Sequence, residues 1–583
     1  MKFQTIAISL SVTLLAACAA DNADENRVAT GTETENLAQV PVIIVADTSA
    51  VEADQMALPE ALVAREEAYR VSAAKHSQAM PGLVATGMVQ GNIRHAREPL
   101  YRENYQHFDT HGVMRVLNEP VSTFSIDVDT GSYSNMRRWL NQGQLPPEDA
   151  VRVEEFINYF SYAYPVPQDT QTPFSVSTEM APTPWNRNTR LLRVGIQGYR
   201  VPREQLPASN LVFLIDVSGS MSSNDKLPLL QKALGMLVGK LDADDSISMV
   251  VYAGASGVVL PPTKGNRKAE ILSALQQLQA GGSTNGAAGI RLAYQMAQQN
   301  FVKDGVNRVI LATDGDFNVG LASTEELIDL IQRKREAGIA LTTLGFGSGN
   351  YNDHLLEQLA DEGNGNHAYI DRLSEARKVL AEELTSTLLT IAKDVKIQVE
   401  FNPERVSEYR LIGYENRILA EEDFNNDKVD AGEIGAGHRV TALYEISLTG
   451  GAGQRLPERR YQHGKKASAE SSQPLSHELA HLRIRYKLPG EDASRLIESP
   501  ITDSDFNGTG SESLNFAASV AAFGQKLRGG KYLESMTYDD IEELARNSRG
   551  NDPHGYRGEF MQLVALAGTL DQTANVAHNT QAK

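Results

Sequence analysis

Residues 211–221 read Leu-Val-Phe-Leu-Ile-Asp-Val-Ser-Gly-Ser-Met, so a short apolar run ends in one carboxylate and two hydroxyls. An apolar run of this length predicts a strand that is buried on both faces. Leucines then recur at helical spacing over residues 227–241, which predicts a helix. The order strand, polar loop, helix places Asp216, Ser218 and Ser220 at the carboxyl edge of a parallel sheet, where α/β folds bind ligands.

Two further stretches are expected to bring oxygen ligands to the same edge. Residues 281–286 read Gly-Gly-Ser-Thr-Asn-Gly and place a threonine on a tight loop before a helix. Residues 308–316 contain a second buried run and end in Thr-Asp-Gly-Asp. Because oxygen-only ligands suit hard cations such as Mg²⁺ or Ca²⁺, the sequence predicts a divalent-metal site. Its candidate ligands are Asp216, Ser218, Ser220, Thr284 and Asp314.

The motif DxSxS, followed by a threonine and then by TDG, resembles the von Willebrand factor A (VWA) domain over residues 210–389. The resemblance implies that the two serines and Thr284 contact the metal directly, and that the two aspartates hold it through water. It also implies a sixth position that a carboxylate of a partner protein fills. The expected cofactor is Mg²⁺, with Ca²⁺ or Mn²⁺ as alternatives. A loop that only caps a helix is the alternative without metal, since Ser and Asp favour helix starts.

The N-terminus has the features of an export signal. An apolar run over residues 6–17 is too short to span a bilayer and has the length of a signal-peptide core. It ends Leu-Ala-Ala-Cys, which resembles a bacterial lipobox, so Cys18 is expected to become a lipidated N-terminus that anchors the protein to a membrane. A small residue near an ordinary cleavage site is the alternative. Ala19 after the cysteine favours the outer membrane, facing the periplasm, by the same resemblance. Cys18 is the only cysteine, so no intramolecular disulfide forms.

Length and charge limit the possible functions. A chain of 583 residues is too long for one core, and a net charge of −19 argues against nucleic acid as a partner. We predict a signal peptide and lipobox (1–18), a disordered acidic tether (19–100), an N-terminal VWA-associated segment (101–207), a VWA domain (208–389), a C-terminal β-rich domain with terminal helices (390–572) and a tail (573–583).

Three runs outside the VWA segment alternate apolar and polar residues, as half-buried strands do. They lie at residues 192–197, 395–401 and 440–448, one before the VWA segment and two after it. Because the ends of a doubly wound domain usually lie close together, we hypothesise that both flanks form one domain. The predicted fold class is α/β: a doubly wound, mainly parallel VWA sheet inserted in a β-rich flanking domain with some helices.

The flanks also carry a resemblance of their own. Residues 124–135, 423–438 and 552–560 are similar to the YfbK-like bacterial lipoproteins, and the resemblance covers most of residues 101–570. It implies an N-terminal VWA-associated segment, a VWA domain and a C-terminal domain of unknown function. It implies no particular molecular activity.

Residues 477–481 read His-Glu-Leu-Ala-His, which fits the zinc protease signature H-E-x-x-H. A zinc hydrolase would use His477, Glu478 and His481, and both histidines would have to lie on one helical face. The segment continues instead with alternating apolar and basic residues to 488, which predicts a strand. Residues four apart on a strand are separated by ~13 Å, too far to share one zinc ion.

Two acidic clusters offer weaker metal candidates. Residues 423–433 begin like an EF-hand loop, but Lys428 and Ile434 stand where Gly and Glu are needed. A tight acidic turn is preferred there, with a calcium site of another type as the alternative. For Asp127 and Asp129 we also prefer a structural turn.

The sequence as a whole predicts a binding protein and no enzyme. We expect a lipid-anchored envelope protein that binds a protein partner through a divalent-metal VWA site. An envelope assembly or chaperone-like factor using the same site is one alternative, and the zinc hydrolase is the other.

Overall fold

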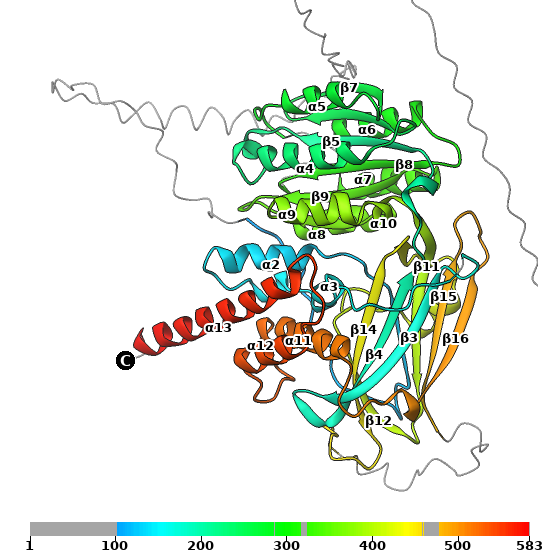
Figure 1. Ribbon diagram of the computed structural model, residues 1–583, viewed down its shortest axis with the longest axis vertical. Helices are drawn as coiled ribbons and strands as arrows, with labels where there is room; N and C mark the ends of the chain where they lie inside the picture. The colour runs from blue at the N-terminus through cyan, green and yellow to red at the C-terminus, as the bar shows by residue number, and fades with distance from the viewer. Residues whose placement is uncertain are drawn as a thin grey trace, which may run out of the picture. The chain divides into compact units, whose positions relative to one another are not determined.

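The computed structural model describes residues 102–168, 170–284, 286–315, 323–457, 459 and 477–581 (Figure 1). The predicted signal peptide, Cys18 and the tether to residue 100 lie outside these residues. Within the described residues, no helix is both long and apolar enough to cross a membrane.

In the described residues, six strands form the central sheet in the order β10-β9-β8-β5-β6-β7. All neighbours are parallel except β6 and β7, which are antiparallel. This is the mainly parallel sheet predicted from the buried runs. Its strands are β5 (Ser209–Asp216), β6 (Ser246–Tyr252), β7 (Ser256–Lys264), β8 (Val306–Thr313), β9 (Ala340–Phe346) and β10 (His367–Ile370).

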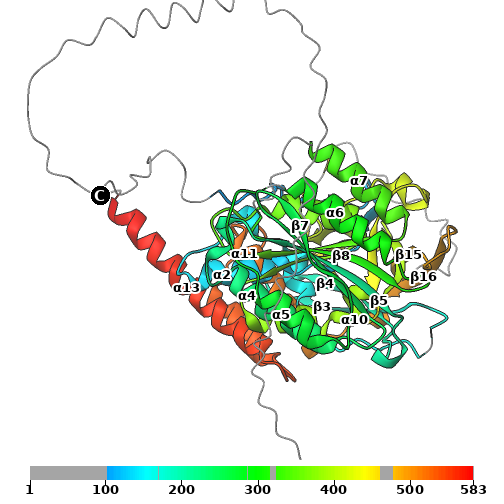
Figure 2. The same ribbon diagram turned by 90° about the horizontal axis from the view of Figure 1, so that it is seen from above.

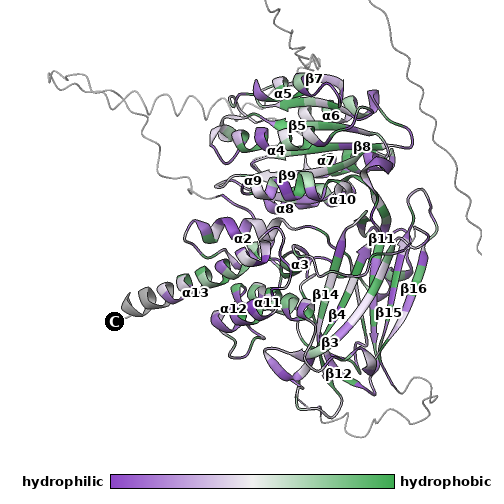
Figure 3. Cartoon of the chain, in the orientation of Figure 1, coloured by the Kyte–Doolittle hydropathy of each residue, from purple (hydrophilic) through white to green (hydrophobic). Residues whose placement is uncertain are grey.

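Helices cover both faces of this sheet. Side chains alternate along β5: Phe213 and Ile215 pack with α4, and Val212 and Leu214 pack with α6. Figure 2 shows α4 and α5 on one side of the strands and α6 and α7 on the other. Figure 3 shows hydrophobic residues concentrated in the central strands. The elements of this part are η3 (Gly219–Ser222), α4 (Leu227–Lys240), α5 (Lys268–Gln276), α6 (Gly286–Gln299), α7 (Thr324–Glu336), α8 (Asp353–Glu362), α9 (Leu373–Arg377), the π-helix η4 (Lys378–Glu382) and α10 (Leu384–Leu388).

Strands from before and after the VWA segment form the two flanking sheets. One described sheet has the order β1-β12-β14-β4-β3, and the other has β13-β11-β15-β16 with β2 also paired to β11. The VWA segment is therefore inserted in a β-rich domain, which confirms the predicted fold class. The strands are β1 (Met114–Arg115), β2 (Val121–Ser125), β3 (Phe174–Thr183), β4 (Asn186–Gly198), β11 (Thr390–Phe401), β12 (Val406–Ile412), β13 (Gly432–Gly435), β14 (Arg439–Leu448), β15 (Glu478–Lys487) and β16 (Arg495–Thr502).

The alternation in these strands decides which core each face joins. Val194 and Ile196 on β4 pack in the core between the two sheets with Ile397 and Val399 on β11. The opposite face of β4 contributes Leu191 to a second core, which helices cover. These helices are α2 (Gly131–Asn141), α3 (Val153–Asn158), α11 (Glu512–Leu527), α12 (Tyr538–Asn547) and α13 (Tyr556–Gln581), and short turns are η1 (Glu148–Ala150), η2 (Arg203–Gln205), η5 (Glu421–Asn425) and η7 (Asp503–Asp505).

Two arginines with little exposed surface join the flanking domain to the VWA part: 12% of the Arg417 side chain and 0% of the Arg137 side chain are exposed. Arg417, in the loop after β12, contacts Glu357 at 3.2 Å and Asp361 at 2.7 Å on α8. On α2, Arg137 contacts Asp371 at 2.5 Å. Asp129 accepts a hydrogen bond of 2.9 Å from the backbone N–H of His367 on β10. The acidic turn before α2 is therefore part of this contact.

Candidate metal centre

Asp216 is the last residue of β5, and three neighbouring groups fix its carboxylate. Oδ1 accepts a hydrogen bond from the backbone N–H of Ser218 at 2.8 Å. Oδ2 accepts from the hydroxyls of Thr313 at 3.0 Å and Tyr252 at 3.2 Å. Burial raises the pKa of Tyr252, so its hydroxyl keeps the proton that it donates. The strands β5, β6 and β8 thus all hold one carboxylate in place.

The two serines of DxSxS lie next to each other on the turn that follows. The Oγ atoms of Ser218 and Ser220 are 2.9 Å apart. Ser218 is buried whereas Ser220 is exposed, and Met221 is buried behind them in the VWA core. The pair therefore leads from the buried carboxylate of Asp216 out to solvent.

A second loop lies against this turn. The backbone N–H of Gly219 donates to the carbonyl of Gly282 at 3.0 Å, and the N–H of Gly281 donates to the carbonyl of Val217 at 2.7 Å. Gly282 has φ +87°, a conformation that favours glycine. Thr284, two residues further on, is half-buried directly before α6. The loop of the third predicted hydroxyl thus packs against the loop of the first two.

Asp314 directly follows β8 and is fully buried. Its Oδ2 accepts a hydrogen bond from Nζ of Lys226 at 2.8 Å. Nζ of Lys226 also donates to Oδ1 of Asn350 at 3.2 Å. Sequence reasoning missed Lys226 and Asn350. The lysine precedes an expected helix, and its residue type alone does not say that its side chain turns inward.

The loop after β9, Gly347–Asn352, also lies at this edge of the sheet. A Cβ on Gly315 would lie 2.3 Å from the backbone nitrogen of Asn352, so only glycine allows the two loops to approach this closely. Residues just after the predicted tether contact the loop after β9 as well. The backbone N–H of Arg102 donates to the carbonyl of Gly349 at 2.7 Å, and Glu103 accepts from the N–H of Gly349 at 2.9 Å.

The electrostatics of the site favour a cation. Burial raises the pKa of Asp216 to about 6, and the negative charge of Asp314 adds to the rise. A positive charge placed beside Asp216 would favour its ionised form. Among the described residues, no group of three or more His, Cys, Asp or Glu side chains is placed to hold a metal. The candidate set has two carboxylates and three hydroxyls, and this oxygen-only chemistry fits a hard divalent cation.

The H-E-x-x-H segment lies on a strand, as predicted. His477 lies in the turn before β15, and Glu478 and His481 belong to β15 itself. His481 lies opposite Glu400 of β11 and Pro500 of β16. An extended backbone separates the two histidines by ~13 Å, so the helical zincin geometry is not present.

Basic side chains fix the acidic turn at residues 423–433. Asp427 accepts a hydrogen bond from Arg485 at 3.0 Å, and Asp430 pairs with Arg335. Nζ of Lys396 donates to the backbone carbonyls of Asp423 and Asn426. Basic side chains thus contact both carboxylates and backbone carbonyls of this turn.

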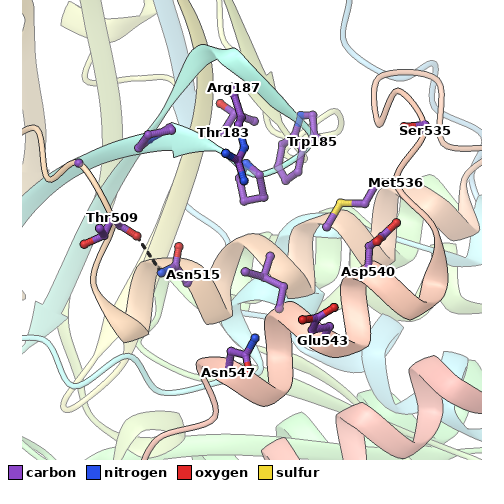
Figure 4. A pocket seen from close by; sticks show the side chains of 14 residues that line it. Thr183, Trp185, Arg187, Thr509, Asn515, Ser535, Met536, Asp540, Glu543 and Asn547 are labelled. Atoms are coloured by element: carbon purple, nitrogen blue, oxygen red, sulfur yellow. Dashed lines mark hydrogen bonds between the residues drawn. The ribbon is translucent and has the colours of Figure 1, made fainter.

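A groove of about 740 Å³ lies between the β3–β4 hairpin and α12 in the flanking domain (Figure 4). Trp185 and Arg187 lie on one wall, and Asp540 and Glu543 lie on the other. None of the candidate metal ligands lines this groove.

The mainly parallel sheet, with DxSxS, threonine and aspartate loops at its carboxyl edge, defines a VWA-type protein. The family model described as von Willebrand factor type A domain matches residues 210–384, and that described as von Willebrand factor matches residues 99–193. A third model, described as the C-terminal part of the uncharacterized protein YfbK, matches residues 386–570. The uncharacterized protein YfbK of Escherichia coli K12 is 49% identical over 469 residues, which cover 79% of this chain and 80% of that protein. The chain therefore belongs to the YfbK family, which confirms the resemblance seen in its motifs.

More distant relatives match parts of the chain. The uncharacterized protein sll0103 of Synechocystis is 29% identical over 32% of this chain and 43% of its own length. Inter-alpha-trypsin inhibitor heavy chain H3 of Mesocricetus auratus is 27% identical over 41% of this chain and 29% of its own length. The chain thus spans less than half of either protein. Among solved structures, a von Willebrand factor type A protein from Catenulispora acidiphila covers 66% of this chain and 88% of its own, with 15% identity and a TM-score of 0.37.

Proposed function

We propose that this protein captures a protein partner through a divalent cation at the carboxyl edge of its VWA sheet. The observation that carries the proposal is the arrangement of five oxygen-bearing side chains on adjoining loops, with Asp216 and Asp314 fully buried and Ser220 exposed. Membership of the VWA and YfbK families supports a binding role but names no partner.

Each part of the site has a distinct task in this proposal. Ser218, Ser220 and Thr284 would hold the cation, and Asp216 and Asp314 would balance its charge. When bound, the cation supplies a positive charge and a coordination position for a carboxylate of the partner. The chain itself holds Asp216 rigid through three hydrogen-bond donors and leaves Ser220 open to the approaching partner.

We assign no catalytic role to this site. The hydroxyl of Ser218 lies 2.9 Å from the hydroxyl of Ser220, and nucleophilic catalysis needs a general base at that distance instead. An assembly or chaperone-like factor would use the same residues and would differ only in its partner. A zinc hydrolase is disfavoured because Glu478 and His481 lie on a strand.

We further propose that lipid on Cys18 anchors the protein in the bacterial envelope, at the outer membrane and facing the periplasm. The support is the sequence at residues 6–19. An anchor there would leave a tether of about 80 residues before the folded part, which in a flexible chain spans on the order of 50 Å. The site would then search for partners close to the membrane surface.

The test is capture of partners from membrane extracts with Mg²⁺ or with EDTA, together with metal affinity measured from thermal melts. Wild type should bind Mg²⁺ and should capture partners only when the metal is present. Thr284→Ala should lose both properties and stay folded. The control is Asp225→Asn, which removes an exposed carboxylate close to the same loop and should keep both. Capture that persists in EDTA would reject the proposal.

A further inference from the structure

Lys226 is a buried cation that pairs directly with one of the two candidate metal-binding carboxylates. Its Nζ lies 2.8 Å from Oδ2 of Asp314, and the exposed fractions of the two side chains are 8% and 0%. An ion pair on the surface would contribute little to stability. A buried pair at this distance interacts strongly, because solvent screens the two charges poorly. The chain therefore supplies its own positive charge at this edge of the sheet.

We propose that Lys226 competes electrostatically with the divalent cation, so that the metal binds firmly only together with an anionic partner. This inference rests on the proposed function and concerns how metal binding at the same site is regulated. Lys226 is a positioning and affinity-setting residue in this scheme and is not a ligand of the metal.

The charge balance of the site gives the reason. Asp216, Asp314 and Lys226 together carry one net negative charge when both carboxylates are ionised. A divalent cation leaves one excess positive charge in a buried site, which is unfavourable. One carboxylate from a partner removes that excess. Without the lysine, the two aspartates balance the cation alone, and a partner adds no charge compensation.

The surrounding loop keeps the lysine in this position. Gly347 has φ +71°, and a Cβ there would lie 2.3 Å from Cε of Lys226, so the glycine leaves space for the aliphatic stem. Asn350 of the same loop accepts the second hydrogen bond from Nζ. The loop is in turn held by Glu103, which accepts from the N–H of Gly349 and pairs with Arg138 at 2.7 Å. The ammonium group therefore cannot move away freely when a metal arrives.

The test compares the Mg²⁺ affinity of the full chain in detergent with and without acetate, which stands in for the partner's carboxylate. Affinity is taken from the Mg²⁺ dependence of the melting temperature. For the wild type, saturating acetate should tighten Mg²⁺ binding. Lys226→Met keeps the stem and removes the charge, so it should bind Mg²⁺ on the order of tenfold more tightly without acetate and should lose the acetate effect. Lys240→Met, at the exposed end of α4, is the matched control and should behave like wild type.

A second variant covers the case that Lys226→Met does not fold. Asn350→Ala removes one of the two acceptors that hold the ammonium, so it should tighten Mg²⁺ binding in the same direction by a smaller factor. If the wild type binds Mg²⁺ but neither variant binds it more tightly without acetate, this inference alone is overturned. No Mg²⁺ binding by wild type or variants would overturn the proposed function as well.

Discussion

At the scale of single residues, the proposed metal-binding role of Asp216 would come at the expense of stability. Its carboxylate is fully buried, and burial raises its pKa to about 6. The folded state without metal thus carries an unfavourable charge above that pH, because the unfolded chain ionises near the ordinary value of 3.8. The three donors around the carboxylate reduce this penalty. They also make Asn a better test than Ala, since Ala would leave buried donors unpaired at about 1–3 kcal/mol each.

We predict that Asp216→Asn separates stability from metal binding. Without metal, the variant should melt at the same temperature as wild type or higher at pH 7.5, because the buried charge is gone. Wild type should gain about 2.7 kcal/mol when free Mg²⁺ exceeds Kd a hundredfold, and the variant should gain nothing. Thermal melts with and without Mg²⁺ measure both effects. A variant that still melts later in Mg²⁺ would show that the metal binds elsewhere.

At the scale of elements, helix α3 buries an acidic residue that is not part of the candidate metal site. Glu154 lies in the first turn of α3, and only 1% of its surface is exposed. Glu154 packs against Gly413. A Cβ on Gly413 would lie 2.7 Å from the backbone nitrogen of Glu154. Burial raises the pKa of Glu154 to about 8, and the charge of Glu415 adds to the rise. The helix therefore takes up a proton on folding at neutral pH.

This pKa predicts how stability depends on pH. Between the ordinary value of 4.5 and about 8, the folded state binds a proton that the unfolded state has lost. Stability should thus fall as pH rises through this window, by at most about 1.4 kcal/mol per pH unit. Glu154→Gln should raise the melting temperature at pH 8 and flatten its decline between pH 5 and pH 8. Glu148→Gln, at an exposed site, is the control. Equal pH profiles for both variants would refute the assignment.

Elements could be predicted from the sequence where the pattern is local. The apolar run ending at Asp216 and the alternation at residues 192–197 each specify a strand. A strand buried on both faces is continuously apolar, whereas a strand buried on one face alternates apolar and polar residues. The same reasoning predicted that the H-E-x-x-H segment runs into a strand alternating to residue 488, and the structure has β15 at Glu478–Lys487. Lys226 and Glu103 could not be predicted, because Lys226 contacts Asp314, 88 positions away, and Glu103 contacts Gly349, 246 positions away. No local pattern records such contacts.

At the scale of the whole molecule, the proposed lipid anchor would determine where the candidate site meets its partners. We predict that Cys18→Ser abolishes lipid attachment, because no thiol remains to form the thioether. Metabolic labelling with a fatty acid and fractionation of membranes measure this directly. The variant should remain as a precursor or be soluble, and wild type should be labelled and sediment with membranes. Acyl label on Cys18→Ser would contradict the lipoprotein assignment.

The contact between the flanking domain and the VWA part includes the largely buried Arg417, which compensates several acidic side chains. Arg417 lies within 4.0 Å of carboxylates of Asp127, Asp129, Glu357 and Asp361. Burial raises the pKa of Glu357 and of Asp361, and the arginine opposes that rise. Without the arginine, these carboxylates would repel one another at the contact between the two parts. The contact is therefore stable only as a complete charge cluster.

We predict that Arg417→Met, which keeps the aliphatic stem, destabilises the protein by about 3–5 kcal/mol, the usual result of removing one partner from a buried ion pair. Arg495→Met is the matched control. Its partner Glu491 is 2.8 Å away, but both side chains are more than 40% exposed, so the loss should be about 1 kcal/mol or less.

The deficit of Arg417→Met should shrink from pH 8 to pH 5, because acid neutralises the uncompensated carboxylates. Thermal melts at both pH values measure this, and hydrogen exchange should show faster exchange in α8 of the variant. Equal losses for the two arginine variants, or a loss that grows at pH 5, would mean that charge compensation does not hold the two parts together.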